Sequence, residues 1–184
     1  MNSNVAAMIG SLIQRESDQF TDNPLDKGGP TKFGITQAVY NAAGYTGSVA
    51  DCTQSIASVI YTKLYWIAPG FDMVDTIDSG LAERLFDWGV NSGQTTAGKA
   101  LQRALNVLNR NGADWHDLTV DGSVGTMTIN AIQQLSAKRG ADGLKVLRGM
   151  VQALQSVNYI EIAERNPSQE AFEFGWQLNR AFGV

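Results

Sequence analysis

Residues 4–16, Asn-Val-Ala-Ala-Met-Ile-Gly-Ser-Leu-Ile-Gln-Arg-Glu, determine how the chain begins to fold. Apolar side chains recur every three to four positions in this stretch, and this spacing predicts an amphipathic helix over residues 4–18. The same period continues the apolar stripe from Leu12 to Glu16, which lies about 40° around the helix from it. The stripe therefore ends in a carboxylate, and its apolar members are Val5, Met8, Ile9, Leu12 and Ile13.

Glu16 has two interpretations. Apolar neighbours make a carboxyl group hold its proton to higher pH, and a carboxyl group that is protonated near neutral pH can act as a general acid. The alternative is a glutamate at a helix end whose charged head reaches water past an apolar stem. Its position alone leaves both interpretations open.

The segment after this helix, residues 21–30, is rich in turn-forming residues. Its two prolines and its Gly-Gly pair exclude a helix and predict a fixed loop, with room for a short hairpin. This loop carries Asp26, which could face Glu16 across a gap, and two carboxylates flanking a gap are the minimum for glycosidic hydrolysis. The alternative is an aspartate that only shapes a turn.

The remaining sequence predicts a mainly helical protein of about eight helices with at most one small β-hairpin. One helix is expected over residues 53–66, and its inward stripe is Ile56, Val59, Ile60 and Leu64. Farther along the chain, one helix is expected to end at Gly140 and a long one to cover residues 143–165.

The distribution of charge predicts two lobes with a boundary near residue 94. Before that position there are ten acidic and five basic residues, whereas the two kinds are nearly balanced after it. We therefore expect one lobe over residues 1–93 and a helical lobe over residues 94–184. A small-molecule site is expected between them, because clefts between such lobes commonly hold one.

Composition excludes several classes of function. A net charge of −4 provides no general attraction for nucleic acid. The single Cys52 and the single His116 argue against a disulfide framework, a metal site and a nucleophilic triad, so no cofactor or metal is expected. No apolar run is long enough to cross a bilayer, so no stable membrane insertion is expected.

Residues 5–13 are apolar, but no basic residue precedes them, and Arg15 and Glu16 follow closely. We therefore interpret this segment as a helix of the mature protein and not as an export signal. The expectation is a protein that accumulates in the cytoplasm of a host or bacterium before release and then acts on the cell wall.

Several motifs give the chain a resemblance to the muramidases of glycoside hydrolase family 108, which include phage endolysins. In the first half they are Arg-Glu-Ser at residues 15–17 and Asn-Pro-Leu-Asp-Lys-Gly-Gly-Pro-Thr-Lys-Phe-Gly-Ile-Thr at residues 23–36. The family usually has Glu-Gly-Gly at its catalytic glutamate, where this chain has Glu-Ser-Asp. The second half resembles the predicted peptidoglycan-binding region of the same family at residues 86–93, 101–106, 120–125 and 175–180.

The resemblance implies a lysozyme-like fold in which Glu16 is the general acid and Asp26 and Thr31 hold the attacking water. Thr31 has an alternative role as a turn or capping hydroxyl. The candidate sugar-binding residues are Asn91, Trp66 and Gln37, although an aromatic side chain at a helix end commonly belongs to the core.

Two further features of these motifs favour a structural interpretation. Arg84 and Asp87 lie on one side of their predicted helix, where a solvated ion pair is expected. Asp121 and Gly122 are expected to form a turn.

The resulting hypothesis is a monomeric peptidoglycan hydrolase that cleaves the bond between N-acetylmuramic acid and N-acetylglucosamine. The alternatives are a non-catalytic wall-binding or structural component and a chitinase, which would share the carboxylate chemistry. A wall hydrolase without an export signal would depend on a separate membrane-permeabilising protein, such as a holin, for its release.

Overall fold

The computed structural model describes residues 3–16, 18–22 and 29–183, without the side chain of Arg15. It is mainly helical with one two-stranded hairpin, which confirms the predicted fold class. The chain forms two compact units, Met1–Trp66 and Ile67–Val184, called unit 1 and unit 2 below. The boundary between the two units follows Trp66 and so lies before the predicted lobe boundary near residue 94. The division into domains at residue 94 stays a prediction.

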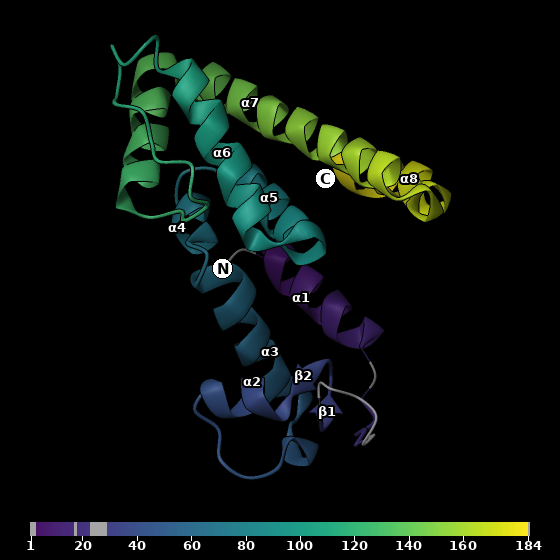
Figure 1. The fold of residues 1–184 in the computed structure, drawn as a ribbon. Coiled ribbons are helices and arrows are strands. Elements are labelled where there is room, and N and C mark those ends of the chain that lie inside the picture. The colour runs from purple at the N-terminus through teal and green to yellow at the C-terminus, as the bar shows by residue number, and fades with distance from the viewer. Residues whose placement is uncertain (1–2, 17, 23–28, 184) are drawn as a thin grey trace. The chain divides into compact units, whose positions relative to one another are not determined.

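Unit 1 contains a hairpin and several short helices (Figure 1). Helix α1 packs against α3, and buried side chains from both helices contribute to the core of this unit. The elements are α1 (Ser3–Arg15), β1 (Thr31–Lys32), β2 (Ile35–Thr36), α2 (Gln37–Ala42), η1 (Val49–Asp51), α3 (Gln54–Thr62) and η2 (Lys63–Ile67), which runs on into unit 2.

Helix α1 confirms the predicted amphipathic pattern, since Val5, Ile9 and Ile13 are all buried. It ends at Arg15, three residues before the predicted end. The backbone N–H of Glu16 still donates to the carbonyl of Leu12, at 3.3 Å. The next two residues are serine and aspartate, whose side chains compete for backbone hydrogen bonds and so favour the end of a helix.

One small hairpin is present, as the predicted fold class allowed, but it lies at residues 31–36, directly after the segment 21–30 in which the sequence left room for it. Strands β1 and β2 are antiparallel, with Thr31 opposite Thr36. Both residues of the turn, Phe33 and Gly34, have positive φ values of 52° and 69°. This is the geometry of a tight two-residue hairpin, and glycine at the second position adopts it without strain.

Unit 2 is a bundle in which α6 packs against both α5 and α7. Its buried core includes Phe71, Leu85, Trp88, Leu101 and Leu147. The elements are α4 (Phe71–Asp75), α5 (Ser79–Ser92), α6 (Gln94–Leu108), α7 (Thr126–Arg165), η3 (Pro167–Gln169), α8 (Glu170–Trp176) and η4 (Gln177–Ala181).

Helix α7 is interrupted at Gly140, where φ is 55° and ψ is −145°. This confirms the predicted helix end, because a residue with a side chain rarely adopts that conformation. The predicted stripe of α3 is partly wrong, since Val59 and Leu64 are exposed while Ala57, Ile60 and Tyr61 are buried.

In the described part of the chain, no helix is long and apolar enough to cross a membrane. Nor do these residues form a group of three or more His, Cys, Asp or Glu side chains that could hold a metal ion. Cys52 is fully buried, and this burial raises the pKa of its thiol.

Candidate functional site

Glu16 lies immediately after the last residue of α1, next to the hairpin turn. A Cβ atom built on Gly34 would lie 2.9 Å from Oε2 of Glu16 and 2.8 Å from the hydroxyl oxygen of Tyr61. The carboxylate and the hydroxyl therefore both rest against the Gly34 backbone. Glu16 and Gly34 are exposed, so substrate can reach the carboxylate. Of the two interpretations that the sequence left open, this exposure fits a glutamate at a helix end whose head reaches water, and the role of Glu16 as general acid stays a prediction.

Tyr61 also lies next to the hairpin turn, although no pattern in the sequence pointed to it. It comes from α3, is 7% exposed, and donates a hydrogen bond from its hydroxyl to the carbonyl of Phe33 at 2.9 Å. Burial raises the pKa of Tyr61, and the negative charge of Glu16 is the next largest cause. Gly34 in the hairpin motif was a signal, but its neighbours are Glu16, which follows α1, and Tyr61 of α3, and no local pattern reveals them.

Thr31 lies in β1 with its side chain half-buried. Its hydroxyl donates to the carbonyl of Gly29 at 2.9 Å, and its backbone exchanges two hydrogen bonds with Thr21. This hydrogen bonding fits the turn interpretation and leaves the hydroxyl oxygen able to accept. Asp26 lies outside the described residues, so its position opposite Glu16 stays a prediction.

The two candidate sugar-binding residues of unit 1, Gln37 and Trp66, have side chains that are engaged within the fold. The Gln37 amide donates to Asn41 and to the carbonyl of Gly47, and it accepts from the N–H of Val49. These bonds hold the loop after α2 in place. Trp66 is 1% exposed, which favours the core interpretation that the sequence left open.

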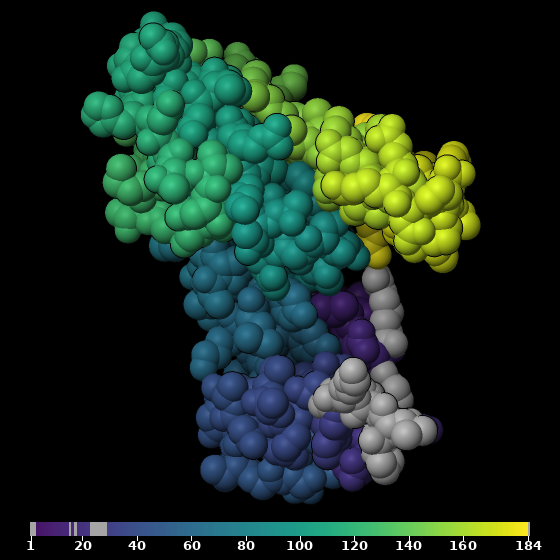
Figure 2. All heavy atoms as spheres, viewed as in Figure 1, coloured from purple at the N-terminus to yellow at the C-terminus, as the bar shows by residue number. Residues whose placement is uncertain are grey.

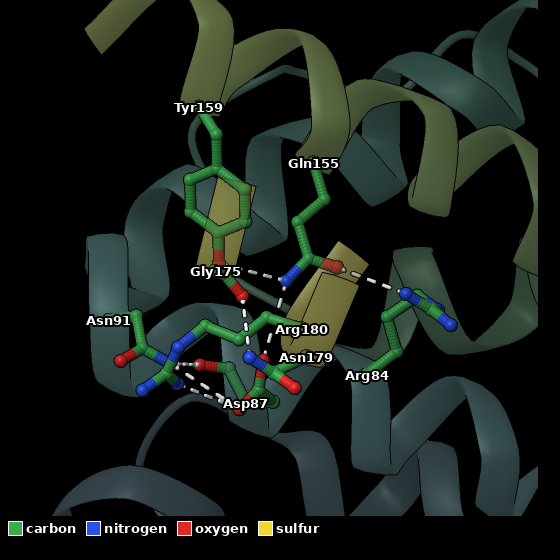
Figure 3. A network of polar contacts seen from close by, with 8 residues as sticks. All are labelled: Arg84, Asp87, Asn91, Gln155, Tyr159, Gly175, Asn179 and Arg180. Atoms are coloured by element: carbon green, nitrogen blue, oxygen red, sulfur yellow. Dashed lines mark hydrogen bonds and ion pairs between the residues drawn. The ribbon is translucent and has the colours of Figure 1, made fainter. Parts of the chain in front are cut away.

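Asn91 belongs to a polar network in unit 2 (Figure 3). Its amide donates to the backbone carbonyl of Asp87 at 2.6 Å, and the Asp87 carboxylate forms an ion pair with Arg180 at 3.2 Å. Asn91 is exposed, so its side chain can still reach a ligand.

Arg84 is buried, so the predicted solvated setting of its pair with Asp87 is wrong. Arg84 is 5% exposed and donates to Oε1 of Gln155 at 3.1 Å and to the carbonyl of Ala181 at 2.9 Å. Its guanidinium is thus held by α7 and by the C-terminal segment, and burial lowers its pKa.

A second candidate surface is a cavity of about 350 Å³ in unit 2, lined by the loop after α6 and the first turn of α7. This loop lies on the surface (teal-green in Figure 2). The side chain of Gln102 is buried and holds this loop in place. Its amide nitrogen donates to the Asp121 carboxylate and to the carbonyl of Ser123, and its amide oxygen accepts from the N–H of Gly122. Asp121 accepts from the N–H of Ser123, which confirms the predicted turn. The cavity is lined by Asp117, Thr119, Asp121, Thr126 and Met127, among others.

Comparison with known proteins gives two family matches. Residues 9–93 match the model of glycosyl hydrolase 108, and residues 96–181 match the model of the predicted peptidoglycan domain. Among solved structures, that of SagA from Brucella abortus is 22% identical, with a TM-score of 0.49; the alignment covers 98% of this chain and 100% of that chain. No curated protein is significantly similar to the sequence.

Proposed function

Because residues 9–93 belong to the glycosyl hydrolase 108 family and residues 96–181 to the predicted peptidoglycan domain family, we propose that this chain is a muramidase. Its substrate is the bond between N-acetylmuramic acid and N-acetylglucosamine in peptidoglycan. The observation that carries the proposal is the position of Glu16 within the first family match, exposed and resting against Gly34 and Tyr61.

In the proposed reaction, Glu16 donates a proton to the glycosidic oxygen as the bond to that oxygen breaks. Asp26 and Thr31 hold the water that attacks the sugar carbon, and Asp26 accepts a proton from that water. Asn91 binds substrate through its exposed amide. A monomeric state and release by a holin remain expectations about the same protein.

The decisive experiment is digestion of purified cell walls followed by mass spectrometry of the fragments. A new reducing end on N-acetylmuramic acid supports the proposal. A new reducing end on N-acetylglucosamine contradicts the proposed bond, and an absence of cleavage favours a wall-binding or structural component. Chitin digested in parallel tests the chitinase alternative.

Substitutions of Asp26 and Thr31 should differ in severity. Asp26→Asn is expected to be almost inactive, because an amide cannot accept a proton from water. Thr31→Ala is expected to lose less activity, because a second water can replace a neutral hydroxyl in part. Initial rates on labelled walls measure both variants. If Asp26→Asn is at least as active as Thr31→Ala, Asp26 does not have the proposed role.

We propose the cavity of unit 2 as the wall-binding surface, since it lies within the match to the peptidoglycan domain. Thr126 is exposed and lines this cavity, so Thr126→Trp should fill it and weaken co-sedimentation with purified walls by about threefold or more. Asn130→Trp is the matched control, because Asn130 is exposed one turn farther along α7. Equal retention of both variants by the walls would place the binding surface elsewhere.

A further inference from the structure

We propose that the cavity of unit 2 binds the free amino-acid end of a peptidoglycan stem peptide, a group with an ammonium and a carboxylate on one carbon atom. The ammonium lies against the carboxylates of Asp117 and Asp121, and the carboxylate lies over the N-terminus of α7. In a stem peptide that contains diaminopimelate, the side chain of that residue ends in such a group. The inference rests on the proposed function, because it takes the cavity as the wall-binding surface and names the part of the wall that binds there.

The N-terminus of α7 contributes one part of the cavity. Gly125, the N-cap residue, and the first three residues of the helix, 126–128, all line it. Glycine has no side chain, so no side chain at the N-cap satisfies the first N–H groups of the helix. These N–H groups have no partner within the helix, and together with the helix dipole they attract an anion. This part of the cavity can therefore accept a carboxylate.

The buried hydroxyl of Thr128 is an independent sign of a ligand at the same place. Thr128 lines the cavity and is only 2% exposed. Among the residues that the structure describes, its hydroxyl has no hydrogen-bond partner. A buried polar group without a partner is costly, so such a group commonly marks the position of a bound molecule. Thr128 can donate to the carboxylate that the helix N-terminus attracts.

Two carboxylates from the loop before α7 also line the cavity. Oδ1 of Asp121 accepts from the Gln102 amide at 2.9 Å and from the N–H of Ser123 at 2.8 Å. Oδ1 of Asp117 accepts from the Asn109 amide at 2.6 Å. The hydrogen bond from Gln102, followed by that from Ser123, lowers the pKa of Asp121, so this group is charged at neutral pH. The Oδ2 atoms accept none of these bonds and can accept from an ammonium group.

This combination favours a zwitterion over a simple ion or a sugar. Among the described residues that line the cavity, none is basic and none is aromatic, and Lys99 acts on Asp121 from outside the lining. Two carboxylates repel a ligand that is only anionic, and a ligand that is only cationic leaves the helix N-terminus and Thr128 without a partner. A sugar would find no ring to stack on. Leu118 and the exposed Met127 provide apolar contacts for the aliphatic chain that carries the charged group.

The first test needs no catalytic activity. The ¹⁵N-labelled protein is titrated with γ-D-glutamyl-diaminopimelate and with γ-D-glutamyl-lysine, which differ by one carboxylate at the end of the side chain. The amide signals of residues 126–128 should shift, and the diaminopimelate dipeptide should bind at least about fivefold more tightly. Equal affinity of the two dipeptides overturns the proposal, and so do shifts that spare residues 126–128.

Two further probes separate a stem peptide from other ligands. Free alanine has the same charged group without the rest of the peptide, and it should bind at least about threefold more weakly than the diaminopimelate dipeptide. An oligomer of N-acetylglucosamine should leave the signals of residues 126–128 in place. Alanine that binds as tightly as the dipeptide overturns the assignment to a stem peptide. An oligosaccharide that shifts the same signals as strongly overturns it too.

The ammonium site is tested with Asp117→Asn and Asp121→Asn. Both variants keep an oxygen that can accept the present hydrogen bonds and remove the negative charge. Each should bind the diaminopimelate dipeptide at least about threefold more weakly, with an unchanged circular dichroism spectrum. Asp142→Asn is the matched control, because Asp142 is exposed on α7 and is not part of the lining. If both cavity variants bind like Asp142→Asn, the proposal is overturned.

The carboxylate site is tested with Thr128→Val, which keeps the shape of the side chain and removes the hydroxyl. It should weaken binding of the diaminopimelate dipeptide by about threefold or more and leave the lysine dipeptide unaffected, because only the first has the carboxylate. Thr128→Ser keeps the hydroxyl and should restore most of the loss. An equal loss for both dipeptides overturns the proposal, because a structural effect of the substitution would not distinguish them.

Wall hydrolysis and wall retention separate this inference from the proposed function. If the dipeptide binds as expected and the protein cleaves no walls, the ligand of the cavity stands and the muramidase assignment fails. If Thr126→Trp weakens retention by walls but the dipeptide does not bind to the wild-type protein, the wall-binding surface stands and the proposed ligand is wrong.

Discussion

Glu16→Gln is expected to lower wall hydrolysis by at least about 100-fold while the protein stays folded. The amide has nearly the size of the carboxyl group, so it can rest in the same position over Gly34 and beside Tyr61. It has no acidic proton to donate to the leaving oxygen, so the loss falls on the chemical step. Initial rates on labelled walls at saturating substrate measure it as a fall in kcat.

The control for this substitution is Glu164→Gln, which makes the same chemical change at an exposed position of α7. It should have wild-type activity. Circular dichroism spectra should be unchanged for both variants. If Glu16→Gln retains more than about a tenth of the wild-type rate with an unchanged spectrum, Glu16 is not the general acid.

The sequence predicted those parts of the fold that depend on local patterns. The stripe of α1 and the break at Gly140 follow from helical periodicity and from the conformational freedom of glycine, and both are present. The inward face of α3 was predicted less well. The chain passes into a π-helical segment after Thr62, and this changes the angular spacing at Leu64. Val59 precedes that segment and is exposed because the buried face of α3 is formed by Ala57, Ile60 and Tyr61.

In the candidate site, too, local sequence patterns do not reveal contacts between residues that are far apart in the chain. Glu16 became a candidate because it follows a local apolar stripe, whereas Tyr61 contacts the hairpin turn from a position 28 residues after Phe33. Arg84 is a stronger case, since its acceptors are 71 and 97 residues away in sequence. Spacing within one helix suggested only a surface pair with Asp87, whereas tertiary packing places the guanidinium in the interior.

Arg84→Met is expected to destabilise the protein by about 3 kcal/mol or more, because it removes one partner from a buried, charged hydrogen-bond network. Methionine approximates the aliphatic part of arginine but donates no hydrogen bond, so Gln155 Oε1 and the carbonyl of Ala181 lose the bonds that Arg84 supplies. Asp87 keeps its ion pair with Arg180 but loses the buried positive charge nearby.

Urea unfolding followed by circular dichroism measures this effect. Arg84→Met should unfold at a lower urea concentration than the wild type, with a similar dependence of the unfolding free energy on urea. Arg139→Met is the matched control, because Arg139 is exposed, and it should stay within about 0.5 kcal/mol of the wild type. Arg84→Lys should restore only part of the loss, since a single ammonium group lacks the planar fork that spans acceptors from α7 and the C-terminal segment. If Arg84→Met unfolds at the same urea concentration as Arg139→Met, the buried network does not hold the C-terminal segment on α5. The Arg180–Asp87 pair and apolar packing would then be sufficient to hold it.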